Sequence, residues 1–412
     1  MNQPIEKCRI SGSKNLISVL NLGYQKLTGV FPRSRAEPVT DGPLELVWCM
    51  DSGLLQLRHS YDPTEMYGDN YGYRSGLNQS MVAHLNHKVN YLLRLRPIDV
   101  EDWVLDIGSN DATTLKAYGM RSRRRVGMDP TGAKFSKYYT DGIELIPDFF
   151  ASRPFQEKFP NARPKIITSI AMFYDLEDPL KFVQEIADLL HPEGIWHFEQ
   201  SYMPSMLRTN SYDTICHEHV EYYSLLPVME LLKRCGLRVI DVQMNAVNGG
   251  SFAVTACHAG ANLRSNNAVI QWLLEQEDRM GLRTPRPFRQ FEERVFEHRV
   301  NLQRLMKALN ADGKTVYGYG ASTKGNVLLQ FCGFTEKEIP YIAEVNPDKF
   351  GCYTPGSNIP IISEEEARKR KPDYFFVLPW HFKENILQRE REYLLQGGKF
   401  IFPLPEIEII GG

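Results

Sequence analysis

From Trp103 onward the sequence alternates between short apolar runs and segments with helical spacing. Such alternation favours a parallel sheet that is wound with helices on both faces. The last two runs have no helix between them, so we expect them to form an antiparallel pair at one edge of the sheet. The runs, in order, are WVLDIG, RRVGMD, GIELIPDFF, PKIITSIAMFY, GIWHFEQSYM, LRVIDVQM and SFAVTACH.

A second alternating unit begins at KTVYGYGASTKGNVLLQF and continues through IPYIAEV, YFFVLP and KFIFPLP. Between the two units, residues 264–311 are charged and carry apolar residues at helical intervals, which predicts a helical connector. Residues 1–60 are rich in turn residues and hold short strands such as ELVWC and LLQLR. The helical pattern QSMVAHLNHKVNYLLRL follows. The predicted fold class is α/β, with two wound units after a small N-terminal module.

Composition excludes several classes of function. The 412 residues carry 48 Lys and Arg against 50 Asp and Glu, so the net charge of −2 gives no reason to expect nucleic acid. No apolar run approaches the roughly 20 residues that span a bilayer. The first residues show no hydrophobic signal region, and seven scattered cysteines suit a reducing compartment. We therefore expect a cytoplasmic monomer or weak dimer that binds neither membrane nor nucleic acid.

A cofactor site is predicted where the first strand of the wound unit ends, in VLDIGSNDATTL. Asp106 lies in the strand, and Gly108 and Asn110 follow in the turn to the next helix. The turn lacks the G-x-G-x-x-G pattern of dinucleotide sites. Carboxylates here would repel a pyrophosphate, whereas the sulfonium and ammonium groups of S-adenosylmethionine tolerate them.

Two further residues extend this cofactor prediction. Asp129 ends the second strand, where acidic residues bind ribose hydroxyls, although it is also placed to cap the next helix. Phe149 or Phe150 ends the third strand and is expected either to flank an adenine ring or to belong to the core.

The second unit opens with a glycine turn that resembles an anion site. Ser322, Thr323 and Lys324 offer donors at a predicted helix N-terminus. Asn326 follows Gly325, so the motif is not a P-loop. Glu344 ends the next strand, where a ribose-binding acid would lie, and on sequence alone NAD is a rival ligand. His381, after a later strand, is expected either to face the same cleft or to lie in a surface turn.

The segment DTICHEHVEYYSL concentrates titratable side chains and allows three interpretations. His217 and His219 are two residues apart, which does not match the H-E-x-x-H spacing of zinc proteases on a helix. A plain surface turn is the second interpretation. The third is an acid–base site, because a neutral histidine is suited to remove a proton near pH 7.

Five motifs follow one another along the chain: MYGDNYGYRSGLNQSM, LDIGSND, DTICHEHVEYYSL, VNGGSF and YGYGASTKGN. In this order they resemble the sugar-nucleotide C-methyltransferases, in particular the C-3′-methyltransferases of nucleotide-linked 4-keto-6-deoxy sugars. The resemblance covers nearly the whole chain. It implies an N-terminal zinc-binding module, a central methyltransferase and a C-terminal Rossmann-like domain, here expected at residues 1–70, 71–265 and 266–412.

The resemblance implies C-methylation of a nucleotide-linked 4-keto-6-deoxy sugar, expected at C-3, through proton removal, enolate formation and attack on the methyl group of S-adenosylmethionine. It places the general base on His219, with Glu218 beside it; we add His217 and Tyr222 in support. Tyr73 is expected to reach the site. The family often has Tyr where this chain has Cys216.

The C-terminal domain is then expected to hold the sugar nucleotide, with Lys324 near the phosphates. An NAD-dependent oxidoreductase that uses this domain is the alternative function, and a non-catalytic sugar-nucleotide binding protein is a third.

The N-terminal module departs from the family pattern. The family carries paired C-x-x-C motifs for zinc, whereas this chain has Ser11 and Ser52 after Cys8 and Cys49. A serine hydroxyl replaces a thiolate poorly in a closed tetrahedral site. We therefore expect no structural zinc and no metal at the active site.

Overall fold

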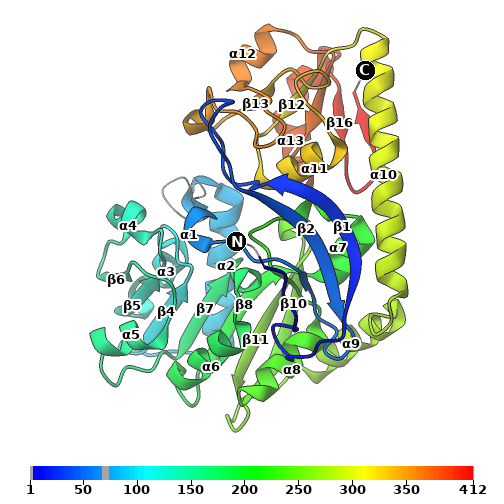
Figure 1. Cartoon of the computed structure of the whole chain (residues 1–412). Helices are drawn as coiled ribbons and strands as arrows, with labels where there is room; N and C mark the ends of the chain where they lie inside the picture. The colour runs from blue at the N-terminus through cyan, green and yellow to red at the C-terminus, as the bar shows by residue number, and fades with distance from the viewer. Residues whose placement is uncertain (1–2, 67–73, 412) are drawn as a thin grey trace.

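The computed structural model describes residues 3–66 and 74–411, and these residues form three sheets (Figure 1). The central sheet has the order β10-β11-β8-β7-β4-β5-β6. Neighbours from β8 to β6 are parallel, whereas β11 pairs antiparallel with both β8 and β10. The predicted wound sheet with an antiparallel edge is confirmed. Its strands are β4 Trp103–Ile107, β5 Arg124–Met128, β6 Ile143–Ile146, β7 Ile166–Ile170, β8 Ile195–Ser201, β10 Leu237–Asn245 and β11 Ser251–His258.

Helices cover the central sheet, and α2 (Gln79–Leu95) coincides with the predicted helical segment. The Asn78 side chain accepts hydrogen bonds from the Ser80 and Met81 amides and so begins this helix. Its buried positions include Leu85, Val89 and Leu92, which recur at the spacing of one helix face. The other helices of this part are α3 Thr113–Tyr118, α4 Gly132–Phe135, α5 Ser152–Lys158, α6 Pro179–Leu189, α7 Met203–Thr209 and α8 Leu225–Arg234.

The C-terminal sheet has the order β14-β13-β12-β15-β16-β17, with β17 as an antiparallel edge on otherwise parallel strands. The predicted connector consists of α9 (Asn267–Met280) and α10 (Arg286–Ala311), and α10 runs along one side of the molecule from the central to the C-terminal part (Figure 1). The remaining elements are β12 Val316–Tyr319, β13 Ile342–Glu344, β14 Ile361–Ser363, β15 Tyr374–Val377, β16 Phe400–Phe402, β17 Glu408–Ile410, α11 Thr323–Cys332, α12 Glu364–Lys369, α13 Lys383–Arg389 and α14 Arg391–Leu395.

The N-terminal module is an antiparallel sheet that borrows its last strand from the central part of the chain. Its order is β1 (Leu16–Lys26), β2 (Asp41–Cys49), β3 (Leu55–Leu57) and β9 (Glu221–Tyr222), and the short helix α1 (Pro63–Met66) follows β3. β9 belongs to the HEH segment, so the module and the predicted acid–base site are parts of one structure.

One buried apolar cluster joins all three parts of the chain. It includes Leu46 of β2, Met206 of α7 and Leu329 of α11. The expected domain boundaries at residues 70 and 265 stay predictions. Among the described helices, none combines the length and the apolarity that a membrane crossing requires.

Candidate active site

A cavity of about 470 Å³ lies where the central sheet, the HEH segment and α11 meet. Its position at the carboxyl ends of β4, β5, β7 and β8 is the usual ligand site of a wound sheet. Residues that the sequence predicted from three distant motifs line this one space. They are Asp106, Gly108, Asn110, Asp129 and Phe149 of the central part, Glu218 and His219 of the HEH segment, and Thr323 and Lys324 of α11.

The loop after β4 is held in an uncommon backbone conformation. Gly108, Asn110 and Ala112 have φ values of 70°, 49° and 61°, which turn the chain tightly between β4 and α3. Asp106 is buried below this loop and accepts a hydrogen bond from the Thr168 hydroxyl at 2.5 Å. Burial raises the pKa of Asp106 to about 7.

Asp129 organises the same loop. Its carboxylate accepts hydrogen bonds from the Asn110 amide (2.7 Å), the Thr131 amide (2.7 Å) and the Thr131 hydroxyl (2.6 Å). A carboxylate has about four acceptor positions, and bonds from the described residues occupy three of them, which leaves one for a ligand hydroxyl. Both roles considered for this residue, loop cap and ligand contact, are therefore compatible with its geometry.

The two phenylalanines after β6 have different environments. Both line the cavity, but Phe149 is 45% exposed, whereas the Phe150 ring packs against Phe182 at 5.0 Å between centroids. Phe149 therefore has the more accessible ring for stacking on a flat ligand. The prediction for Tyr73 falls outside the described residues.

Glu199 of β8 also lines the cavity and was not among the predicted site residues. It accepts hydrogen bonds from His84 at 2.6 Å and Asn245 at 2.9 Å, and it pairs with Lys88 at 2.8 Å. Burial alone would raise its pKa, but the His84 and Lys88 contacts lower the pKa to about 2. Glu199 therefore stays ionised and ties α2 to the cavity wall.

The contacts of His219 define its tautomer. Nδ1 lies 2.9 Å from the Thr214 carbonyl oxygen, which can only accept, so Nδ1 carries the proton. Nε2 is then the basic atom of a ring that lines the cavity and packs on its other side against Tyr174. Burial, helped by the charge of Lys324, lowers the pKa of His219 to about 3, so the ring is neutral at pH 7.

Glu218 lies beside this base. Within the described residues it has no hydrogen bond or ion pair, and burial raises its pKa to about 7. Its accessible surface faces the cavity. The ligand atoms of Cys216, Glu218 and His219 lie within 4.8 Å of one another, a grouping that can hold a metal ion as well as move a proton.

The other two predicted catalytic residues lie away from this cavity. His217 is buried, its Nε2 lies 3.4 Å from the Gly42 carbonyl oxygen, and its ring meets the Tyr61 ring edge-on. It therefore faces the N-terminal module. The Tyr222 hydroxyl donates to the Thr214 carbonyl at 3.5 Å, and Tyr222 lines a separate void of about 10 Å³ that His219 also borders.

Lys324 is the cation that α11 contributes to the cavity. Its ammonium donates to the Asn248 carbonyl at 3.4 Å. Burial lowers the pKa of Lys324, and the carboxylate of Asp213 opposes this effect. An anionic ligand group at this position would gain a charge partner that is already desolvated.

The remaining predicted substrate residues act on local structure. The Ser322 hydroxyl accepts from the Gly325 amide at 3.1 Å and caps α11. The Glu344 carboxylate accepts from three backbone amides, those of Ala321, Val345 and Asn346. His381 packs between Trp380 and Phe382.

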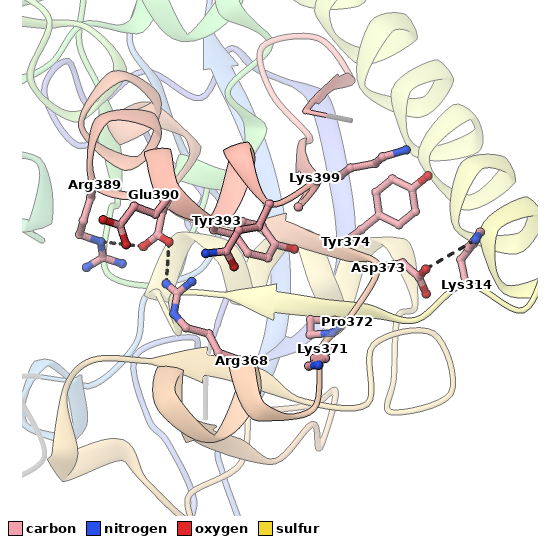
Figure 2. Close-up of a pocket in the computed structure, with 14 residues that line it drawn as sticks. Lys314, Arg368, Lys371, Pro372, Asp373, Tyr374, Arg389, Glu390, Tyr393 and Lys399 are labelled. Carbon is pink, nitrogen blue, oxygen red and sulfur yellow. Dashed lines mark hydrogen bonds and ion pairs between the residues drawn. The ribbon is translucent and has the colours of Figure 1, made fainter.

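A larger hollow of about 750 Å³ lies on the C-terminal part (Figure 2). Lys314, Asp373 and Lys399 place it at the amino ends of β12, β15 and β16, opposite the edge where Lys324 lies. Arg368 pairs with Glu390 at 2.6 Å, and Lys314 pairs with Asp373 at 3.5 Å (Figure 2). Its charges are largely paired with one another, and none of the predicted site residues that the structure describes lines it.

The fold and the cavity define a methyltransferase that uses S-adenosylmethionine. The residues fit this cofactor, because Asp106, Asp129 and Glu199 give the cavity wall an acidic character that suits a sulfonium and an ammonium group and opposes a pyrophosphate.

Three family models match successive parts of the chain: a putative zinc binding domain over residues 8–67, a methyltransferase domain over 81–242 and a C-methyltransferase C-terminal domain over 246–405. The C-methyltransferase NovU of Streptomyces niveus is 33% identical over 411 residues, which cover 99% of this chain and 97% of that protein. The chain belongs to this family of C-methyltransferases.

Solved structures resemble part of the chain. CalS10, an amino pentose methyltransferase from Micromonospora echinaspora solved with S-adenosylmethionine bound, is 12% identical, covers 44% of this chain and 92% of its own, and has a TM-score of 0.34. An S-adenosylmethionine-dependent methyltransferase from Clostridium acetobutylicum is 10% identical over 43% and 92% of the two chains, with a TM-score of 0.34.

The residues at the zinc positions of the N-terminal module do not fit a closed zinc site. Cys8 Sγ lies 3.2 Å from Ser52 Oγ, and Ser11 Oγ lies 3.6 Å from Cys49 Sγ, so the four side chains meet and bond crosswise. Two thiols and two hydroxyls form this cluster, whereas closed structural zinc sites use thiolate and imidazole ligands.

Proposed function

We propose that the protein methylates a carbon beside the ketone of a nucleotide-linked 4-keto-6-deoxy sugar, at C-3. The observation that carries the proposal is His219, a neutral base whose Nε2 has no hydrogen-bond partner among the described residues and which shares a cavity with the cofactor loop and Lys324. Carbon methylation needs an acidified C–H bond, and the neighbouring ketone provides it. Membership of the C-methyltransferase family supports the reaction class.

In the proposed mechanism His219 Nε2 takes the proton from C-3, and the electron pair of the broken C–H bond forms the enolate. The imidazolium that results keeps its Nδ1–H bond to the Thr214 carbonyl. The Glu218 carboxylate, within reach of the ring, stabilises the new positive charge. The loop from Gly108 to Asn110, together with Asp129 and Phe149, would hold S-adenosylmethionine, which when bound would supply the methyl group and leave as S-adenosylhomocysteine.

Lys324 links substrate binding to the strength of the base. Its positive charge lowers the pKa of His219 in the free protein. A diphosphate or enolate oxygen paired with Lys324 would cancel that effect and raise the pKa of His219 when the substrate arrives. Thr323 is a second contact in the cavity, and Ser322, Glu344 and His381 are proposed to support this end of the site from behind.

The test is a screen of nucleotide-linked 4-keto sugars with S-adenosylmethionine, read as a mass gain of one methyl group. His219→Ala should lose both turnover and solvent-deuterium exchange at the methylated carbon, by at least about a hundredfold. Affinity for S-adenosylmethionine should be retained. The exposed His87→Ala on α2 is the matched control.

Further measurements test the alternatives of a metal site and of an NAD-binding C-terminal domain. If the enzyme still turns over after treatment with a chelator, proton transfer needs no metal ion bound by Cys216, Glu218 and His219. Retained exchange in His219→Ala contradicts the assigned base, and tight binding of NAD contradicts the substrate role of the C-terminal domain.

A further inference from the structure

Helix α11 turns two amide side chains toward the N-terminal module. Asn326, which is fully buried, donates from Nδ2 to the Thr28 carbonyl at 2.7 Å. Gln330 accepts from the Lys26 amide at 2.7 Å and donates to the Lys26 carbonyl at 3.2 Å. Residues four apart lie on one helix face, so α11 binds the backbone at the end of β1 and just after it.

The backbone held in this way ends at Gly29, which lies against the catalytic segment. A methyl group at Gly29 would overlap Glu218 Oε1, and the next residue it would meet is Thr323, whose Oγ1 lies at 3.8 Å. The φ of Gly29 is not in the left-handed region, so the backbone does not require glycine here. What glycine provides is room for a carboxylate.

Packing therefore sets the position of Glu218. Its carboxylate has no hydrogen bond or ion pair within the described residues, although it lies beside the proposed base. Gly29 of the module lies on one side of it, and Thr323 at the start of α11 lies close by.

We propose that Asn326, Thr28 and Gly29 form a clamp through which the N-terminal module and α11 fix the Glu218 carboxylate next to His219. The three are positioning residues, because they act on the reaction through Glu218. The effect of these residues on catalysis rests on the proposed function, whereas their effect on the position of the Glu218 carboxylate does not depend on it. The module then serves to complete the active site.

The first experiment is Gly29→Ala in the full-length protein. The displaced carboxylate should lower kcat about tenfold or more, with the KM for the sugar nucleotide and the Kd for S-adenosylmethionine within about twofold. Gly260→Ala is the matched control, because a Cβ added at Gly260 would meet no atom within 4 Å and its φ is ordinary. Equal kcat values for the two variants would overturn the proposal.

A double variant separates positioning from a general loss of structure. Asp is one methylene shorter than Glu, so Glu218→Asp makes room for the added methyl group. Gly29→Ala should therefore slow the Glu218→Asp enzyme less than about twofold, although it slows the wild type tenfold. Losses that simply multiply contradict the clamp.

Asn326→Asp tests the other end, since it removes the donor to Thr28 and places a carboxylate against that carbonyl. It should reproduce the loss of kcat expected for Gly29→Ala, whereas Asn301→Asp on the exposed face of α10 should not.

A crystal structure of Gly29→Ala tests the clamp without measuring activity. If wild type methylates no keto sugar, the proposed function fails, but a Glu218 side chain that has not moved in that structure overturns the clamp separately.

Discussion

The two central titratable residues have pKa values that burial moves in opposite directions. It lowers the pKa of His219 to about 3 and raises the pKa of Glu218 to about 7. Near neutral pH the base is therefore unprotonated, while the carboxyl beside it is half ionised. Any acid limit on activity near pH 7 should then come from Glu218.

We predict that the rate of methylation rises with pH through about 7 in the wild type, because only ionised Glu218 stabilises the imidazolium. Glu218→Gln should be slower by about tenfold and should lack this rise between pH 6 and 8. The measurement is kcat at saturating substrate across that range. A Glu218→Gln profile that keeps the same inflection contradicts the role of Glu218.

The same substitution should stabilise the fold. A carboxyl whose folded pKa is raised contributes fully below its unfolded pKa, and that contribution is lost as pH rises through the folded pKa of about 7. Glu218→Gln should therefore raise Tm relative to the wild type at pH 8 and change it little at pH 4.5. Glu293→Gln, an exposed carboxyl on α10, should show no such pH-dependent difference in thermal unfolding.

Some of the site residues could be predicted from the sequence, whereas others could not. Asp106 and Asp129 were predicted because acids at strand ends bind ligands in wound sheets, and the same rule would have pointed to Glu199 in HFEQS. Its pairing with Lys88 joins residues more than a hundred positions apart, which no local pattern reveals. Gly29 gave no signal at all, because its role depends on a neighbour in another domain.

At the scale of elements, one buried histidine of α10 contacts both the central and the C-terminal part of the chain. His298 Nδ1 accepts from the Tyr212 hydroxyl at 3.0 Å, and Nε2 donates to the Pro403 carbonyl at 2.6 Å. Tyr212 leads into the HEH segment, and Pro403 follows β16. The helix thus carries a contact between the catalytic segment and the C-terminal sheet.

His298→Ala should lower the free energy of unfolding by about 3 kcal/mol, because it removes two buried hydrogen bonds and leaves Tyr212 without this acceptor. Burial lowers the pKa of His298, so its contribution is present above the unfolded pKa of about 6.5 and is lost as pH falls. Urea unfolding should show a smaller difference from wild type at pH 5 than at pH 8. A difference that is constant with pH contradicts this account, and Arg304→Ala on α10 is the control.

Local patterns predicted the elements whose stability is local. The helix α2 and the edge pair β10 and β11 were expected from periodicity and from the missing helix between two strands. β1 was not expected, because two register shifts interrupt its alternation against β2. β9 is two residues long and exists only because β3, far earlier in the chain, pairs with it.

At the scale of the whole molecule, the N-terminal module is held by its neighbours as well as by its own cluster. The strand β9, the buried apolar cluster and the amides of α11 all attach it to the rest of the protein. Within the module, burial would raise the pKa of the Cys8 thiol, but hydrogen bonds with Ser11 and Ser52 lower it below its usual value. Thiol–hydroxyl contacts thus link the four positions at which the family resemblance predicts zinc ligands.

The cluster therefore gives a direct test of how this module is stabilised. Wild type should hold far less than one zinc per chain by metal analysis, and a chelator should leave its Tm unchanged. Ser11→Cys with Ser52→Cys should create four thiol ligands, bind one zinc per chain and gain a Tm increase that a chelator removes. Because the cluster lies outside the active-site cavity, kcat should change less than about twofold in the double variant. One tightly held zinc in the wild type, with a Tm that falls on chelation, would instead show that two thiols and two hydroxyls suffice for a metal site.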